Sequence, residues 1–210
     1  MIWVGGARKL VFHPAEQTDV TQGERAIRAI ASLSPRLTLA LKAISLTRPF
    51  ILTTEHRMSI SLNVNGRKRT SAATPDTPLL YVLRNDMDIN SAKYGCGVAQ
   101  CGSCTVLLDG KPIRSCVYPA SSALKGKITT LEGLGTPDKL HVLQKAFIEE
   151  QAAQCGFCIS GMIMSAKALL DRVRNPSEAE IRAAMAGNLC RCGTHTRILS
   201  AIQRAAKELA

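Results

Sequence analysis

The chain has 210 residues, a formal net charge of +11, 46% hydrophobic residues and 4% aromatic residues. This length suffices for one domain or two small ones, and the composition predicts an aliphatic, alanine-rich core. No apolar run reaches about eighteen residues, so we expect no membrane span. The basic residues are scattered and do not interleave with aromatic residues, so we expect no nucleic-acid partner but a solvated basic surface or a docking face for an acidic partner.

Residues 1–57 differ from the rest of the chain. They contain no cysteine, and their periodicity is weakly helical over 24–33 and mixed over 37–46. Met58 begins a run typical of the start of a domain. We therefore expect 1–57 to be a disordered extension or an upstream mistranslation, with Met58 as the natural start. A peptide from this segment in the mass spectrum of the native protein would exclude mistranslation.

Residues 58–132 predict a small sheet with one helix, which resembles a β-grasp ferredoxin domain. The predicted strands are 60–64, 67–72, 105–108, 111–117 and 127–131. Asn65-Gly66 and Asp109-Gly110 are typical two-residue hairpin turns between strands. Between the two hairpins a short helix is expected, with Thr77 as its cap and Pro78 at its first position.

Residues 138–210 change to a helical pattern, with candidate helices at 140–152, 157–173, 177–186 and 195–208. Ser177 and Glu180 fit a capping box at the start of the third of these helices. Four short helices in antiparallel pairs predict a compact all-α bundle. The expected fold class is therefore α+β, with a ferredoxin-like domain followed by a four-helix domain.

All eight cysteines fall into two sets. The first set is Cys96, Cys101, Cys104 and Cys116; the second is Cys155, Cys158, Cys190 and Cys192. The first set has the C-x4-C-x2-C spacing of a plant-type [2Fe–2S] centre. Gly95, Gly97 and Gly102 let the backbone wrap such a cluster and bring N–H groups close to its sulfides. The second set consists of two short pairs, each expected at a helix start or in a loop, where N–H groups stabilise thiolates.

Two other fates for the cysteines have to be weighed. A structural zinc site is the alternative for four cysteines in two pairs, although C-x-C is less usual in a zinc knuckle and a ferredoxin-like set lies nearby. Four disulfides are the alternative for an even cysteine count, but short C-x-C and C-x2-C pairs more often chelate metal. The spacing favours two iron–sulfur sites, which together would form an electron-transfer protein.

Three motifs carry a resemblance to a known family. Lys93–Cys104 (KYGCGVAQCGSC), Gln154–Cys158 (QCGFC) and Asn188–Gly193 (NLCRCG) resemble the iron–sulfur subunit of molybdenum hydroxylases, the xanthine dehydrogenase and aldehyde oxidoreductase family. The match covers about 58–208. The resemblance implies a β-grasp ferredoxin domain, a four-helix domain and two [2Fe–2S] clusters.

The resemblance also implies roles for residues and partners. The second set would lie beside a molybdopterin cofactor (molybdenum-pyranopterin, including its cytosine dinucleotide form) on a large partner subunit, where Gln154 and Cys192 would contact the pterin. The first set would face the acceptor, a c-type cytochrome or a flavin subunit. Substrate oxidation would occur on the partner, so we expect no catalytic residue in this chain. The resemblance implies a cytoplasmic protein, associated with the inner membrane only through its acceptor.

Shorter segments narrow the resemblance. Thr77–Asn85, Asp109–Cys116 and Cys192–His195 resemble the small subunits of isoquinoline 1-oxidoreductase and nicotinate dehydrogenase. Glu150–Cys158, Gly161–Met164 and again Cys192–His195 resemble the nicotinate type most. The implied substrate is an N-heteroaromatic compound such as nicotinate or isoquinoline, or an aldehyde. Val98-Ala99-Gln100 departs from the family, which often has a glycine there. A stand-alone ferredoxin-type carrier is the alternative function, although it would leave the Gln154 motif without a use.

Some residues could be mistaken for ligands. His195 follows the second set closely, but four thiolates are already available, and we expect it at a helix start or an interface. His141 is likewise expected to begin a helix. Tyr94 is expected to pack over the first cysteine loop.

Overall fold

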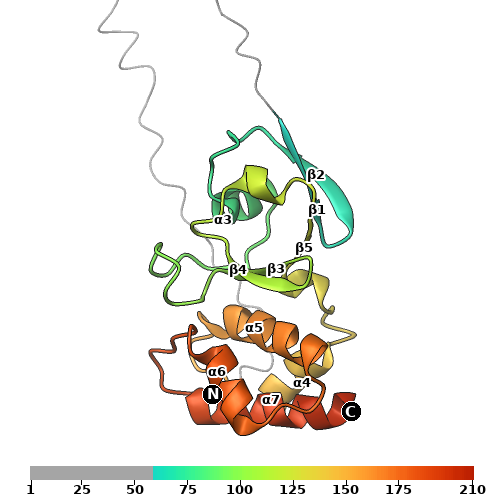
Figure 1. The fold of residues 1–210 in the computed structure, drawn as a ribbon, viewed down its shortest axis with the longest axis vertical. Coiled ribbons are helices and arrows are strands. Elements are labelled where there is room, and N and C mark those ends of the chain that lie inside the picture. Colours follow the sequence, from blue (N-terminus) through green and yellow to red (C-terminus); the bar gives the residue numbers. More distant parts are fainter. Residues whose placement is uncertain (1–58) are drawn as a thin grey trace, which may run out of the picture. The chain divides into compact units, whose positions relative to one another are not determined.

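The computed structural model describes residues 59–210, and the predicted extension 1–57 lies outside them. A five-stranded sheet is formed by β1 (Ile60–Val64), β2 (Arg67–Ser71), β3 (Thr105–Leu108), β4 (Lys111–Arg114) and β5 (Lys127–Thr129), in the order β2-β1-β5-β3-β4 (Figure 1). β1 and β5 are parallel, and the other neighbours are antiparallel. All five predicted strands are present.

The first hairpin forms for the reasons its sequence indicates. Ile60, Leu62 and Val64 are buried on one face of β1. Asn65 and Gly66 both have positive φ, 52° and 75°, as a type I′ turn requires.

Strand β4 ends three residues earlier than the sequence predicts. The Val117 N–H donates to the carbonyl of Arg114, so the chain turns after Arg114 instead of continuing along the sheet. This turn carries Cys116 into the interior, where it is buried.

The predicted cap of the first helix is wrong. Helix α3 (Leu79–Tyr81) begins one residue later than expected, continues into a π-helical turn over Val82–Asp86, and has no side-chain cap. The backbone carbonyl of Tyr118 accepts from Leu79 N–H, and that of Ser115 accepts from Leu80 N–H. Neighbouring backbone therefore satisfies the donors that a cap would have satisfied. The buried side chains of this helix pack in the core of the sheet.

The helical region contains α4 (Val142–Glu149), α5 (Ile159–Arg172), α6 (Glu178–Met185) and α7 (His195–Leu209). Each helix begins and ends within three residues of the bounds that the sequence predicts. The Ser177–Glu180 capping box is confirmed at the start of α6, and His141 forms a second capping box with Gln144 at the start of α4. No helix in the described part is both long and apolar enough to cross a membrane.

The helical core is aliphatic and rich in alanine, as the composition predicts. Phe147 is the one aromatic side chain among the buried members of this cluster. Helix α5 contacts α4, α6 and α7, and also contacts β3 and β4 (Figure 1). A Cβ atom on Gly161 of α5 would overlap the carbonyl oxygen of Gly102, so the helix touches the backbone of the first cysteine loop.

Candidate iron–sulfur sites

The first cysteine loop is built so that backbone N–H groups surround a sulfur atom. Cys96 Sγ accepts from the N–H groups of Val98 (3.4 Å), Gln100 (3.2 Å) and Cys101 (3.3 Å). The backbone hydrogen bond from Val98, followed by that from Cys101, lowers the pKa of Cys96 to about 7. The loop is therefore prepared for a thiolate, the form that binds metal.

The glycines of this loop let the backbone wrap closely around the cysteine sulfurs, as the sequence predicts. Gly97 and Gly102 adopt the left-handed region, with φ of 72° and 74°, which glycine tolerates without strain. A Cβ atom on Gly95 would lie 2.7 Å from Cys101 Sγ, so a side chain there would displace a sulfur. Ala99 lies in the segment Val98-Ala99-Gln100 that departs from the family, and it also has a positive φ of 62°. The segment that departs from the family thus contains a strained residue.

The other two cysteines of the first set are buried. The side chains of Cys104 and Cys116 interact with each other, and burial raises the pKa of Cys104 to about 11. Ser115 Oγ donates to the Cys104 carbonyl at 2.7 Å and holds the two segments together. The set therefore has an outer pair, Cys96 and Cys101, and an inner pair.

The second set comes from two separate segments. Cys158 lies immediately before α5, whereas Cys190 and Cys192 lie in the loop before α7. Burial raises the pKa of Cys158 to about 12. Burial also opposes ionisation of Cys190, but hydrogen bonds from Thr194 outweigh it and lower the pKa of Cys190 to about 7. Cys155 is exposed, and a backbone hydrogen bond from Phe157 lowers its pKa.

All eight thiols are free of disulfides and meet in pairs. The side-chain contacts are Cys96–Cys101, Cys104–Cys116, Cys155–Cys192 and Cys158–Cys190. Within residues 59–210, no three Cys, His, Asp or Glu side chains surround one point as a single-ion site would require. Two pairs per set match a two-iron cluster, in which each iron takes two protein ligands. The residues present therefore fit two [2Fe–2S] clusters, for which the two cysteine sets would be the ligands.

Gln154, which the sequence predicts to contact the pterin, lies on the surface. Gln154 is exposed beside Cys155, and the neighbouring Phe157 is 46% exposed. Leu189, next to Cys190, is 59% exposed. Two apolar side chains beside the second set are thus exposed to solvent.

The histidine and tyrosine predictions are confirmed. His195 is the first residue of α7, and His141 is the cap of α4. Tyr94 packs over Gly97, where a Cβ atom would overlap the tyrosine hydroxyl, and its ring stacks on Tyr81 with the centroids 6.0 Å apart.

The two cysteine sets are joined by contacts that sequence reasoning missed. The Leu189 N–H donates to the carbonyl of Cys101 at 3.0 Å. Arg114 Nη2 donates to the Gly187 carbonyl at 2.8 Å, and Ser165 Oγ donates to Asn188 Oδ1 at 3.0 Å. The asparagine of the NLCRCG motif was visible in the sequence, but Ser165, the partner of its side chain, lies 23 residues away.

Two family models match the chain. A 2Fe-2S iron-sulfur cluster binding domain matches residues 62–129, and a [2Fe-2S] binding domain matches residues 130–203. A nicotinate dehydrogenase subunit from Pseudomonas putida is 58% identical over 71% of this chain and 95% of that protein. The alpha subunit of isoquinoline 1-oxidoreductase from Brevundimonas diminuta is 49% identical over 72% of this chain and 99% of that protein.

The chain belongs to the family of iron–sulfur subunits of molybdenum hydroxylases. A solved structure of quinoline 2-oxidoreductase from Pseudomonas putida 86 agrees, with a TM-score of 0.69 and 40% identity over 72% of this chain and 95% of that chain. The family membership confirms the predicted fold class and the two [2Fe–2S] clusters as cofactors. It also selects an oxidoreductase electron-transfer subunit over a stand-alone carrier.

Proposed function

We propose that this chain serves a molybdenum hydroxylase that oxidises an N-heteroaromatic compound, with nicotinate as the first candidate. The observation that carries the proposal is the 58% identity along 95% of the nicotinate dehydrogenase subunit from Pseudomonas putida. The relatives named for isoquinoline and quinoline point to the same class of substrate. The substrate itself binds elsewhere, so this chain supplies electron transfer and no catalytic acid or base.

We propose that each cysteine set ligates one cluster. Cys96, Cys101, Cys104 and Cys116 would hold the first, and Cys155, Cys158, Cys190 and Cys192 the second. A [2Fe–2S] cluster, when bound, takes up and releases one electron at a time. The N–H groups around Cys96 and the hydroxyl of Thr194 near Cys190 stabilise negative sulfur, which favours ligation by thiolates.

The surface beside the second set suits a large molybdopterin-binding partner. Gln154 is exposed and can offer both an amide donor and an acceptor to the pterin, and Cys192 is half-buried beside Cys155. The exposed Phe157 and Leu189 supply apolar contact area around them. A partner that covers these four residues would desolvate the second set and place the cofactor against it.

The first set is proposed to face the electron acceptor. Cys96 is exposed, and the neighbouring Tyr94 and Val98 are more than half exposed. A c-type cytochrome or a flavin subunit fits this position. The cytoplasmic location stays a prediction.

Co-expression with a molybdopterin subunit encoded beside this chain tests the proposal. We expect a stable complex with four irons and four acid-labile sulfides per copy of this chain, which reduces a dye with nicotinate more rapidly than with isoquinoline or benzaldehyde. The matched Gln154→Ala complex should retain all four irons but be reduced more slowly by substrate. Zinc without acid-labile sulfide, or no association with any molybdopterin subunit, would contradict the proposal.

A further inference from the structure

We propose that Arg114 is a positioning residue that holds the two cysteine sets at a fixed separation. The inference rests on the proposed ligation of clusters by both sets. Arg114 is the last residue of β4, in the sheet domain, yet its side chain reaches a loop of the helical domain 73 positions away.

The guanidinium group contacts both sides of the junction. Its Nη2 donates to the Gly187 carbonyl at 2.8 Å, three residues before Cys190. Its Nη1 donates to Thr105 Oγ1, and that hydroxyl donates in turn to the Gly102 carbonyl at 2.6 Å. One side chain thus connects the carbonyl that follows Cys101 with the loop that carries Cys190. A planar fork with two separate nitrogens suits this task, whereas a lysine ammonium is a single point charge.

Glycines at the junction keep the two backbones close. A Cβ atom on Gly187 would lie 2.7 Å from Arg114 Nη2. A Cβ atom on Gly102 would lie 2.5 Å from Asn188 Nδ2 and 2.7 Å from the Gly187 carbonyl oxygen. Larger residues would separate the loops and break the Leu189 to Cys101 hydrogen bond. The close packing of the glycines and the hydrogen bonds of Arg114 therefore stabilise the same contact, the one between the first cysteine loop and the loop before Cys190.

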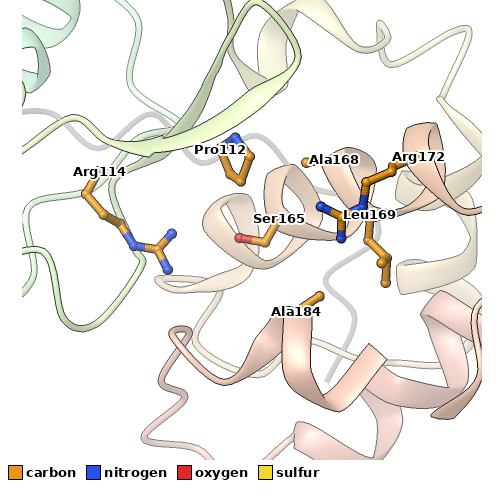
Figure 2. A pocket seen from close by; sticks show the side chains of 7 residues that line it. All are labelled: Pro112, Arg114, Ser165, Ala168, Leu169, Arg172 and Ala184. Atoms are coloured by element: carbon orange, nitrogen blue, oxygen red, sulfur yellow. The ribbon is translucent and has the colours of Figure 1, made fainter. Parts of the chain in front are cut away.

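A cavity beside the hydrogen bond between Arg114 and the Gly187 carbonyl makes the role of Arg114 testable. It has a volume of about 370 Å³, and Figure 2 shows Arg114 and Ser165 at its wall, with Ser165 on α5. Because this space is open to solvent, water can satisfy the Gly187 carbonyl when the guanidinium is removed. The Arg114→Gln chain should consequently still fold into both domains. Only the separation between the two cysteine sets should no longer be fixed.

The test compares the full chain, purified with its clusters, as wild type, Arg114→Gln, Arg114→Lys and Arg182→Gln. Arg182 is the matched control, since within residues 59–210 its guanidinium pairs with Glu178 alone, at the surface and one helical turn away. The first readout is hydrogen exchange of the peptide that contains Leu189. The second is the magnetic splitting between the two reduced clusters in the EPR spectrum, which depends steeply on their separation.

Arg114→Gln is expected to speed exchange at the Leu189 amide about tenfold, the equivalent of one hydrogen bond, and to weaken the magnetic splitting. Arg114→Lys should give intermediate values, and Arg182→Gln should match the wild type. If Arg114→Gln does not fold, Gly187→Ala should move both readouts in the same direction. Unchanged exchange and splitting in chains that retain both clusters would overturn the role of Arg114 and leave the proposed function intact. A wild-type chain without acid-labile sulfide would overturn both.

Discussion

The two cysteine sets reach similar arrangements by different routes. Three cysteines of the first set come from the nine residues 96–104, and backbone N–H groups of the same loop surround Cys96. The second set joins two pairs separated by 31 residues, so its geometry depends on how α5 and α6 pack. Each set nevertheless has an exposed outer cysteine and a buried inner one whose pKa is raised. The first site is thus specified locally, and the second by the tertiary fold.

Replacing one ligand in each set gives the largest expected effect and tests whether the sets are independent. Cys101→Ser should abolish the EPR signal of the first cluster and leave that of the second, whereas Cys155→Ser should do the reverse. Each variant should retain two of the four irons, because the sets share no ligand. Loss of both signals from a variant whose circular dichroism is unchanged would show that the sites assemble together.

Gly161→Ala tests the contact on which both sites depend. Its Cβ atom would overlap the Gly102 carbonyl oxygen, so α5 must move away from the first cysteine loop. We expect a loss of about 1–3 kcal/mol in the free energy of unfolding, measured with urea, and broadening of both EPR signals. Ala168→Ser, on the same helix but at the wall of the cavity, is the control and should unfold like the wild type. A stable Gly161→Ala chain would show that the helix and the loop are not in contact.

Ser177→Ala should affect the second site more than the first. Ser177 caps α6, the helix that leads to Cys190 and Cys192. Loss of the cap should cost about 1 kcal/mol, and the second cluster should be released at a lower urea concentration than the first. Absorbance and EPR recorded across a urea series separate the two clusters. Equal release of both would contradict the dependence of the second site on α6.

Glu132→Gln should lower the stability of the domain that holds the first cysteine set, by an amount that depends on pH. Glu132 accepts hydrogen bonds from Ser91 Oγ (2.5 Å), from Thr130 Oγ1 (2.6 Å) and from the Ser91 N–H (2.8 Å). Burial opposes its ionisation, but these hydrogen bonds outweigh burial and lower the pKa of Glu132 below its ordinary value of 4.5. Its contribution to stability is therefore present above that value and is lost as the pH falls through the lowered pKa.

We expect Glu132→Gln to cost less than about 1 kcal/mol at neutral pH, because Glu132 is exposed and solvent screens its charge, and to approach the wild type in acid. Urea midpoints of both proteins between pH 7 and pH 3 measure the difference. A constant difference across this range would mean that the charge of Glu132 is not involved.

The sequence was sufficient for the elements whose signals are local. The Asn65-Gly66 turn and the Ser177–Glu180 capping box depend on residues next to one another, and both formed as predicted. The Thr77 cap failed because the donors of α3 are satisfied by Tyr118 and Ser115, which lie far along the chain.

The same limit applies to the candidate sites. Cysteine spacing defines the two sets, because ligands of one cluster must lie close together. The assignment of Cys155 to Cys192 and of Cys158 to Cys190 required the packing of α5 against the loop before α7. Nothing in the sequence indicated the role of Arg114, because an arginine at the end of a strand is common. Its partner Gly187, 73 positions away, is known only from the structure.

The smallest expected effect concerns Ala99, a strained residue within the segment Val98-Ala99-Gln100 that departs from the family pattern. Alanine at a φ of 62° is disfavoured, whereas glycine adopts this conformation freely. Ala99→Gly should relieve about 1 kcal/mol of strain and lose part of this gain to the greater entropy of the unfolded chain, for a net gain of about 0.5 kcal/mol. The gain should appear only as slower loss of the first EPR signal in urea. If the second signal is stabilised equally, the strain at Ala99 is shared through the contact between the loops, and the first site is less local than its nine-residue loop indicates.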